Sequence, residues 1–324
     1  MCTAITYKTR DHYFGRNLDL ELSYGEKIVI TPRNYPLRFV YEEEIKKHPA
    51  IIGMGIVVNE YPLYFDATNE AGLSMAGLNF PGNAYYGEIC AEKNNIASYE
   101  FILWVLSICK NISEVRKTLQ NINITNDSFS DEYTPSPLHW VIADRDECIV
   151  VEPMRSGVKI YDNPVGVLTN NPTFDYQMFN LNNYMNLSIN PMINTFSKEL
   201  KLENYSRGMG GMGIPGDLSS MSRFVKAAFT KINSVSGDDE IESVSQFFHI
   251  LSSVAQQRGL VKLDDGKYEI TVYSSCCNTD KGIYYYETYE NSHINGVDMK
   301  KENLEGDKLI SYSLIIKENP AIMG

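Results

Sequence analysis

Strand-like segments in consecutive hairpins constrain the fold of this chain more than any other feature of its sequence. Runs of alternating apolar and polar residues meet at short polar turns, which is typical of antiparallel strands. Candidate helices come in blocks between these runs and not after every strand. The pattern therefore predicts an α+β protein with antiparallel sheets, not a βαβ array. The predicted hairpins are residues 3–19 with a turn near Arg10–His12, residues 61–80 with a turn at Asn69–Gly72, residues 138–153 and residues 268–290; further strands are predicted within 26–34, 50–58, 157–170 and 309–316, and helices over 98–110, 113–121 behind Ser113, 173–186, 219–233 and 241–257 closed by Gly259.

The length and the charge distribution limit the class of protein. The 324 residues contain no internal repeat and no Pro/Gly/Ser-rich linker, so we expect residues 1–324 to form a single domain. The net charge of −12 is spread along the chain and not collected in a tail. Nucleic acids and anionic membrane surfaces need clustered Lys and Arg, so neither is an expected partner.

The beginning of the chain carries no targeting signal that we can identify. It lacks a basic segment followed by an apolar run, and the apolar stretch at residues 101–109 is too short to span a bilayer. We therefore expect no membrane insertion and a cytoplasmic location, where thiols stay reduced.

Metals and cofactors are not expected. The six cysteines form no C-x-x-C pair, and the adjacent Cys276 and Cys277 point to opposite faces of any strand. The glycine-rich stretch 208–217 lacks the Lys-Ser/Thr of a phosphate loop, so it predicts a loop before the next helix. Core packing is the expected role of Cys90, Cys109, Cys148 and one of the adjacent pair.

The cysteine directly behind the initiator methionine is the main functional signal. Removal of Met1 would leave Cys2 with a thiol and a free α-amine on the same residue. Such a residue carries its own nucleophile and its own proton acceptor, because a free α-amine has a pKa of about 7.7–8.0 and a thiol one near about 8.5. Small residues are common at position 2, so the surroundings of Cys2 must decide whether it has a catalytic role.

Two charged residues of the first hairpin lie within reach of Cys2. With a two-residue turn at residues 10–11, Asp19 stands opposite Cys2, and with a three-residue turn it becomes a diagonal neighbour. Aspartate is disfavoured in strands, which favours a functional role for Asp19 beside the amine. Arg16 would stabilise the thiolate. Residues 16 and 19 face opposite sides of a regular strand, so we expect a bend near Asn17–Leu18.

The chain resembles the bile salt hydrolase and penicillin V acylase family of N-terminal nucleophile hydrolases. The resemblance rests on Cys2 and on ordered motifs spread over essentially the whole chain. It implies a four-layer αββα fold with two antiparallel sheets, loss of Met1, a homotetramer, and attack of Cys2 on a carboxamide without metal or cofactor. The motifs are "FGRNLD" (14–19), "AGLNFPG" (76–82), "GVLTNNPTFDYQ" (166–177), "GIPGDLSSMSRF" (213–224) and "KGIYYYETYEN" (281–291).

The site residues follow from this resemblance motif by motif. It implies that Arg16, Asp19 and Arg223 flank the nucleophile, and that Asn170 and the Asn79 region donate hydrogen bonds to the oxyanion. Relatives that favour penicillin V often carry Tyr at position 79, so Asn79 favours conjugated bile salts, whose amide joins a cholyl group to glycine or taurine. The candidate wall residues for the steroid are Leu18, Tyr24, Phe129, Tyr133 and Leu138, and Arg207 is a candidate contact for the carboxylate or sulfonate.

Two alternatives to a bile salt hydrolase stay open at this point. One is a penicillin V acylase or another N-acyl amidase with the same catalytic centre. The other is a non-catalytic steroid- or lipid-binding protein on this scaffold, in which Met1 is retained and Cys2 has no free amine.

Overall fold

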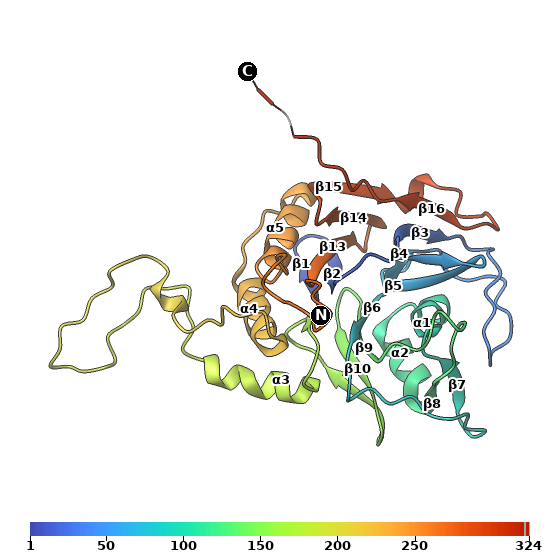
Figure 1. Cartoon of the computed structure of the whole chain (residues 1–324), viewed down its shortest axis with the longest axis horizontal. Coiled ribbons are helices and arrows are strands. Elements are labelled where there is room, and N and C mark those ends of the chain that lie inside the picture. Colours follow the sequence, from blue (N-terminus) through green and yellow to red (C-terminus); the bar gives the residue numbers. More distant parts are fainter. Residues whose placement is uncertain (321, 324) are drawn as a thin grey trace.

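The strands form two large antiparallel sheets and one small parallel pair within residues 1–320, 322 and 323, which the computed structural model describes (Figure 1). The order of the six-stranded sheet is β12 (Val167–Leu168), β1 (Cys2–Lys8), β2 (His12–Leu20), β13 (Ile270–Asn278), β14 (Ile283–Thr288) and β15 (Asn291–Asp298). The order of the eight-stranded sheet is β11 (Gly157–Asp162), β10 (Cys148–Met154), β9 (Leu138–Ala143), β6 (Ser74–Asn79), β5 (Tyr61–Asn69), β4 (Ile51–Val58), β3 (Lys27–Thr31) and β16 (Ile310–Ser313). The small pair is β7 (Asn94–Ala97) and β8 (Ile122–Thr125).

The two large sheets face each other between two layers of helices. On one face of β2, the Asn17 amide donates to the Leu251 carbonyl of α5, and on the opposite face the Arg16 guanidinium donates to the Gly77 carbonyl of β6. On the far side of the eight-stranded sheet, Asn69 of β5 donates to the Leu106 carbonyl of α1 at 2.9 Å. The α+β, four-layer αββα prediction is therefore confirmed (Figure 1). The helices are α1 (Phe101–Ile108), α2 (Ile112–Thr118), α3 (Phe174–Asn180), α4 (Ser220–Asn233) and α5 (Glu240–Ser252).

The register of the first hairpin differs from the prediction. The turn closes with a hydrogen bond of 3.0 Å from the Thr9 nitrogen to the Asp11 oxygen, so Lys8 pairs with His12. Leu18 therefore stands opposite Cys2, so the direct opposition of Asp19 and Cys2 is wrong and the diagonal placement of Asp19 is the one found. Asp19 instead exchanges two backbone hydrogen bonds with Met1, of 2.7 and 2.9 Å, and is a diagonal neighbour of Cys2.

The bend expected near Asn17–Leu18 is also wrong. Strand β2 runs without a break, and the irregularity lies in its partner β13, between Thr271 and Tyr273. The extra residue of β13 absorbs the mismatch as a bulge, so β2 keeps its alternation. Arg16 consequently faces the eight-stranded sheet while Asp19 shares the helix-facing side with Asn17.

The helices lie where they are expected, with corrections at their ends. Helix α5 stops at Ser252 and not at Gly259, which lies in the following loop with a φ of +103°. The cap of α2 is Asn111, whose side chain accepts from the Glu114 nitrogen, and not Ser113. The parallel pair β7–β8 was not predicted because each strand has only four residues, and β15 was not predicted because its sequence is mostly polar.

The cysteines are all unpaired, and their burial follows from the layers. Both Cys276 and Cys277 are buried, where only one was expected in the core, because the six-stranded sheet is covered on both faces. Cys90 and Cys148 are only half-buried, and of the two Cys148 still packs against the core as expected. Within the described residues, no group of three or more His, Cys, Asp or Glu is placed to hold a metal ion. The described helices also include none that is long and apolar enough to cross a membrane.

Candidate active site

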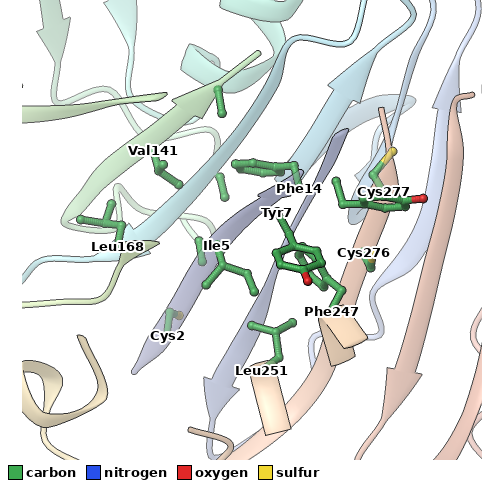
Figure 2. Close-up of a cluster of buried hydrophobic side chains, with 14 of the residues drawn as sticks. Cys2, Ile5, Tyr7, Phe14, Val141, Leu168, Phe247, Leu251, Cys276 and Cys277 are labelled. Carbon is green, nitrogen blue, oxygen red and sulfur yellow. The ribbon is translucent and has the colours of Figure 1, made fainter. Parts of the chain in front are cut away.

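Cys2 is the first residue of β1 and is buried, with 3% of its surface exposed. Its backbone nitrogen donates to Asn170 Oδ1 at 2.8 Å, and its carbonyl oxygen accepts from Arg223 Nη1. Figure 2 shows Cys2 at the edge of the buried cluster that also holds Ile5 and Leu168. Two predicted site residues from distant segments thus contact the backbone of Cys2 directly.

Asn170, two residues after the end of β12, joins three of the predicted positions. Its Oδ1 accepts from Cys2 and, at 2.7 Å, from Arg223 Nη2, while its Nδ2 donates to the Asn79 carbonyl at 2.7 Å. Its backbone nitrogen donates to Ser220 Oγ at 2.8 Å. Ser220 was missed in the sequence, although it stands one helical turn before Arg223 in the "LSSMSRF" stretch and so shares its face.

Arg223 lies in the first turn of α4 and is fully buried. It donates to the Leu218 carbonyl at 2.9 Å and to Thr3 Oγ1 at 2.7 Å, and its Nη1 lies 4.0 Å from Asp19 Oδ2. Burial lowers the pKa of Arg223, although Asp19 and Cys2 act in the opposite direction. A fixed positive charge therefore lies on the helix-facing side of the Cys2 backbone.

Asp19 is fully buried beside the amino-terminal end of β1. Its Oδ1 accepts from Thr271 Oγ1 at 2.6 Å, while Oδ2 makes no hydrogen bond within the described part of the chain. Burial raises the pKa of Asp19, and this effect outweighs the lowering by Arg223 and by the terminal ammonium. The carboxyl group consequently holds its proton more tightly than an exposed aspartate does.

Arg16 lies on the same face of the first hairpin as Cys2, the face toward the second sheet. Its Nη1 donates to the Phe65 carbonyl at 3.2 Å, and its Nη2 has no partner among the described residues. Burial disfavours its charge, but Cys2, Tyr273 and Asp66 raise the pKa of Arg16 above its ordinary value. Asp66 was not anticipated from the sequence. It accepts from the hydroxyl of Tyr273 at 2.7 Å and supplies a buried counter-charge.

Met1 occupies the position before the candidate nucleophile. Its amine donates to the Asp19 carbonyl at 2.7 Å and pairs with the buried Glu269 carboxylate. Burial lowers the pKa of this amine, against the raising effect of Cys2 and Asp19. While Met1 is present, the Cys2 nitrogen is an amide and cannot accept a proton.

The predicted wall residues lie in three different settings. Leu18 stands opposite Cys2, and Leu138 stands opposite Asn79, so both are adjacent to candidate catalytic residues. Arg207 makes no contact with these residues among the described contacts. It is exposed on a segment that projects from the body of the protein (Figure 1). Tyr24 lies against Phe65 with ring centroids 5.9 Å apart, and Phe129 and Tyr133 belong to an aromatic cluster with Tyr61 and Tyr99.

The αββα layers and a cysteine at the head of an inner strand define the class of N-terminal nucleophile hydrolases. Residues 2–312 match the model of a family described as linear amide C–N hydrolases, choloylglycine hydrolase family. The chain belongs to this family, as the resemblance in the sequence indicated.

Similar proteins agree over nearly their whole lengths. The bile salt hydrolase/transferase of Lactiplantibacillus plantarum is 58% identical over 314 residues, which cover 97% of each chain. The structure of the C2A mutant of conjugated bile acid hydrolase from Clostridium perfringens matches with a TM-score of 0.92, 38% identity and full coverage of both chains. Penicillin V acylase from Agrobacterium tumefaciens has a TM-score of 0.76 at 18% identity, covering 98% of this chain and 94% of its own, and shares the fold.

Proposed function

We propose that this protein hydrolyses the amide bond of bile salts conjugated to glycine or taurine. The observation that carries the proposal is the clasp on Cys2, whose nitrogen and carbonyl are held by Asn170 and Arg223 from segments distant in sequence. The name of the Lactiplantibacillus plantarum relative and the Asn at position 79 support the bile salt as substrate.

The mechanism begins with removal of Met1, which converts the Cys2 nitrogen into a free amine. This amine takes the thiol proton, and the thiolate attacks the amide carbonyl carbon. The carbon–nitrogen bond breaks as the amine passes its proton to the leaving glycine or taurine nitrogen. Water then attacks the thioester, releases the free bile acid and restores the thiol. Arg16 stabilises the thiolate, and Asp19 orients the amine.

Asn170 is suited to stabilise the tetrahedral oxyanion. Its amide group has two hydrogens, of which one is donated to the Asn79 carbonyl, leaving the other for the oxyanion. A donor of this kind contributes about 2.7–4 kcal/mol to lowering the barrier. Leu18, Leu138, Tyr24 and the Phe129–Tyr133 pair would supply the apolar wall that a steroid needs.

One set of measurements tests the reaction and its alternatives. Purified protein should lack Met1 by intact mass and should release glycine from glycocholate faster than it cleaves the side-chain amide of penicillin V. Cys2→Ala should abolish release while glycocholate still binds in calorimetry. Faster turnover of penicillin V would favour the acylase alternative, and retained Met1 with no turnover would favour a binding protein.

The thioester also has a second fate open to it, transfer of the acyl group to an amine. The relative that is 58% identical is named a hydrolase/transferase, and this name favours the same for our chain. An amine would attack the thioester carbonyl in place of water and lose its proton to the Cys2 amine. Incubation of glycocholate with labelled taurine should yield labelled taurocholate, and its absence would reject transfer.

Arg207 stays a candidate for reading the amino-acid half of the substrate. Its guanidinium would pair with the carboxylate of glycine or the sulfonate of taurine. Arg207→Ala should alter the ratio of taurocholate to glycocholate turnover. An unchanged ratio would remove Arg207 from the binding residues.

We further infer that the chain assembles as a homotetramer of single-domain subunits. The supporting feature is an arm, residues 188–210, closed at its base by a hydrogen bond of 2.9 Å from the Ser188 nitrogen to the Gly210 oxygen (Figure 1). Neighbouring exposed apolar side chains often mark interfaces between proteins. The exposed apolar side chains of the arm are Ile189, Met192, Ile193, Phe196, Leu200, Leu202 and Tyr205.

Substitutions in the arm test the assembly. The double variant Ile193→Asn, Phe196→Ser should lower the mass measured by light scattering from four chains to fewer. Ile232→Ser on α4 is the matched control, because Ile232 is similarly exposed but lies outside the arm. An unchanged mass of the double variant would reject the arm as the interface. The cytoplasmic location stays an expectation that cell fractionation can test.

A further inference from the structure

His139 and Glu152 form a fully buried pair on the adjacent strands β9 and β10. The imidazole Nδ1 lies 3.3 Å from Glu152 Oε1, and neither side chain is exposed. Burial of two ionisable groups is costly unless they are paired and bonded further. The proposed mechanism uses neither residue, so it does not explain why this pair is buried.

The contacts of His139 reach the neighbours of both catalytic asparagines. Its ring stacks on Phe80 with centroids 4.1 Å apart and an angle of 8° between the planes. Its Nε2 lies 2.8 Å from the Thr169 carbonyl oxygen. Phe80 follows Asn79 and Thr169 precedes Asn170, so one imidazole touches both of the segments that meet in the Asn170–Asn79 hydrogen bond.

Glu152 contacts the segment that contains Asn170 at a second point, further along the chain. Its Oε1 also accepts from the backbone nitrogen of Phe174, the first residue of α3, at 2.9 Å. The pair therefore holds the segment 169–174 near both of its ends, and Asn170 lies between them. Glu152 Oε2 makes no hydrogen bond to the described residues, so the carboxyl group is used on one oxygen only.

The acceptors around His139 define where its protons lie. The Thr169 carbonyl can only accept, so Nε2 carries a hydrogen. Nδ1 faces a carboxyl oxygen, and the two atoms are bonded only when one proton lies between them. His139 is thereby fixed as a donor toward Thr169, and its orientation is set by Glu152.

We propose that His139 and Glu152 are positioning residues for the acyl transfer. The pair fixes the main chain on both sides of Asn170, so that Oδ1 meets the Cys2 nitrogen and Nδ2 meets the oxyanion. It acts through Asn170 and touches neither substrate nor thiol. The inference rests on the proposed amidase function only for the turnover measurements.

Three variants of the mature enzyme separate positioning from folding. The double variant His139→Leu, Glu152→Met removes both ionisable side chains together, and replacing a whole buried pair by apolar residues is often tolerated. Glu152→Gln keeps the shape of the side chain. His139→Gln keeps an amide that can donate to Thr169. His12→Gln is the matched control, because His12 is also a buried histidine but lies at the far end of the hairpin.

In turnover of glycocholate, the variants should change kcat and leave KM nearly unchanged. A shift of the catalytic donors lowers kcat of the double variant by about tenfold to a hundredfold, while KM changes by less than about threefold. His139→Gln should recover part of this loss, and the His12→Gln control should keep the kcat of the parent enzyme. The rate of alkylation of Cys2 by iodoacetamide, followed by peptide mass mapping, should fall several-fold in the double variant.

The outcomes distinguish this inference from the proposed function. A parent enzyme that hydrolyses no bile salt would defeat the proposed function, while the alkylation rates would still test the pair. Folded variants with the parent kcat and alkylation rate would overturn the positioning role, as would a rise in KM alone. If the double variant fails to fold, Glu152→Gln gives the same comparison.

Discussion

Replacing Asn170 by alanine is the most direct test of the site. Its side chain makes three hydrogen bonds, one of them to the buried guanidinium of Arg223 and the others to Cys2 and Asn79. A bond to a charged group contributes about 1.5–3 kcal/mol and a neutral one about 1 kcal/mol. The free energy of unfolding of Asn170→Ala should therefore drop by about 3–5 kcal/mol, which most proteins survive at room temperature.

The same substitution should also lower kcat, and this effect is separate from the loss of stability. Without the Nδ2 donor, the oxyanion loses about 2.7–4 kcal/mol, so kcat for glycocholate should fall by about a hundredfold to a thousandfold. Urea unfolding gives the stability, and fluorescamine detection of released glycine gives kcat.

Asn170→Asp separates the two roles of the side chain. Aspartate keeps the oxygen that accepts from Cys2 and Arg223 but has no amide hydrogens. Its stability should lie closer to the parent than that of Asn170→Ala, while kcat should fall as far. A folded Asn170→Asp enzyme with a kcat within about threefold of the parent would refute the oxyanion role.

Three further predictions concern the charges and the packing. Burial raises the pKa of Asp19 in the folded protein, so the parent loses stability as the pH rises from about 3.8 through that raised pKa. Asp19→Asn should therefore be at least as stable as the parent at pH 7. Its turnover should fall at least about tenfold. Denaturant midpoints and kcat check this, and unfolding at pH 7 would instead make Asp19 structural. Burial raises the pKa of Glu100 to about 7, so Glu100→Gln should gain on the order of 1–3 kcal/mol over the parent at pH 8 and almost nothing at pH 4, measured by urea unfolding; an equal gain at both pH values would contradict the linkage. A Cβ on Gly15 would overlap the Ser275 carbonyl oxygen of the neighbouring strand, so Gly15→Ala should cost about 3 kcal/mol, whereas Gly211→Ala, with open space around it, should cost far less; equal midpoints would show that the strands can separate.

The layers of this fold and its nucleophile could be predicted because they depend on local patterns. Alternation along each strand and polar turns identified most hairpins, and the position of Cys2 directly after Met1 indicated the chemistry. Family membership was also predictable, since the motifs containing Asp19, Asn170 and Arg223 occur in order along the chain.

The geometry around Cys2 could not be predicted, since it depends on contacts between distant segments. The register of the first hairpin is set by one turn hydrogen bond at Thr9, which moves Asp19 from Cys2 to Met1. The bulge between Thr271 and Tyr273 depends on how β13 fits β2, and neither strand reveals it alone. The hydrogen bonds of Asn170 with Asn79 and Arg223 could not be predicted either, because these partners are 91 and 53 residues away in the sequence.

The clasp on Cys2 also has a consequence for the order in which this protein becomes active. The thiol is among the first groups to leave the ribosome, yet its partners at positions 170 and 223 are made only when more than half of the chain exists. A growing or truncated chain therefore presents an ordinary thiol without its orienting groups. In the proposed mechanism, hydrolysis begins only after Asn170 and Arg223 have folded against Cys2, so an incomplete chain should not hydrolyse amides.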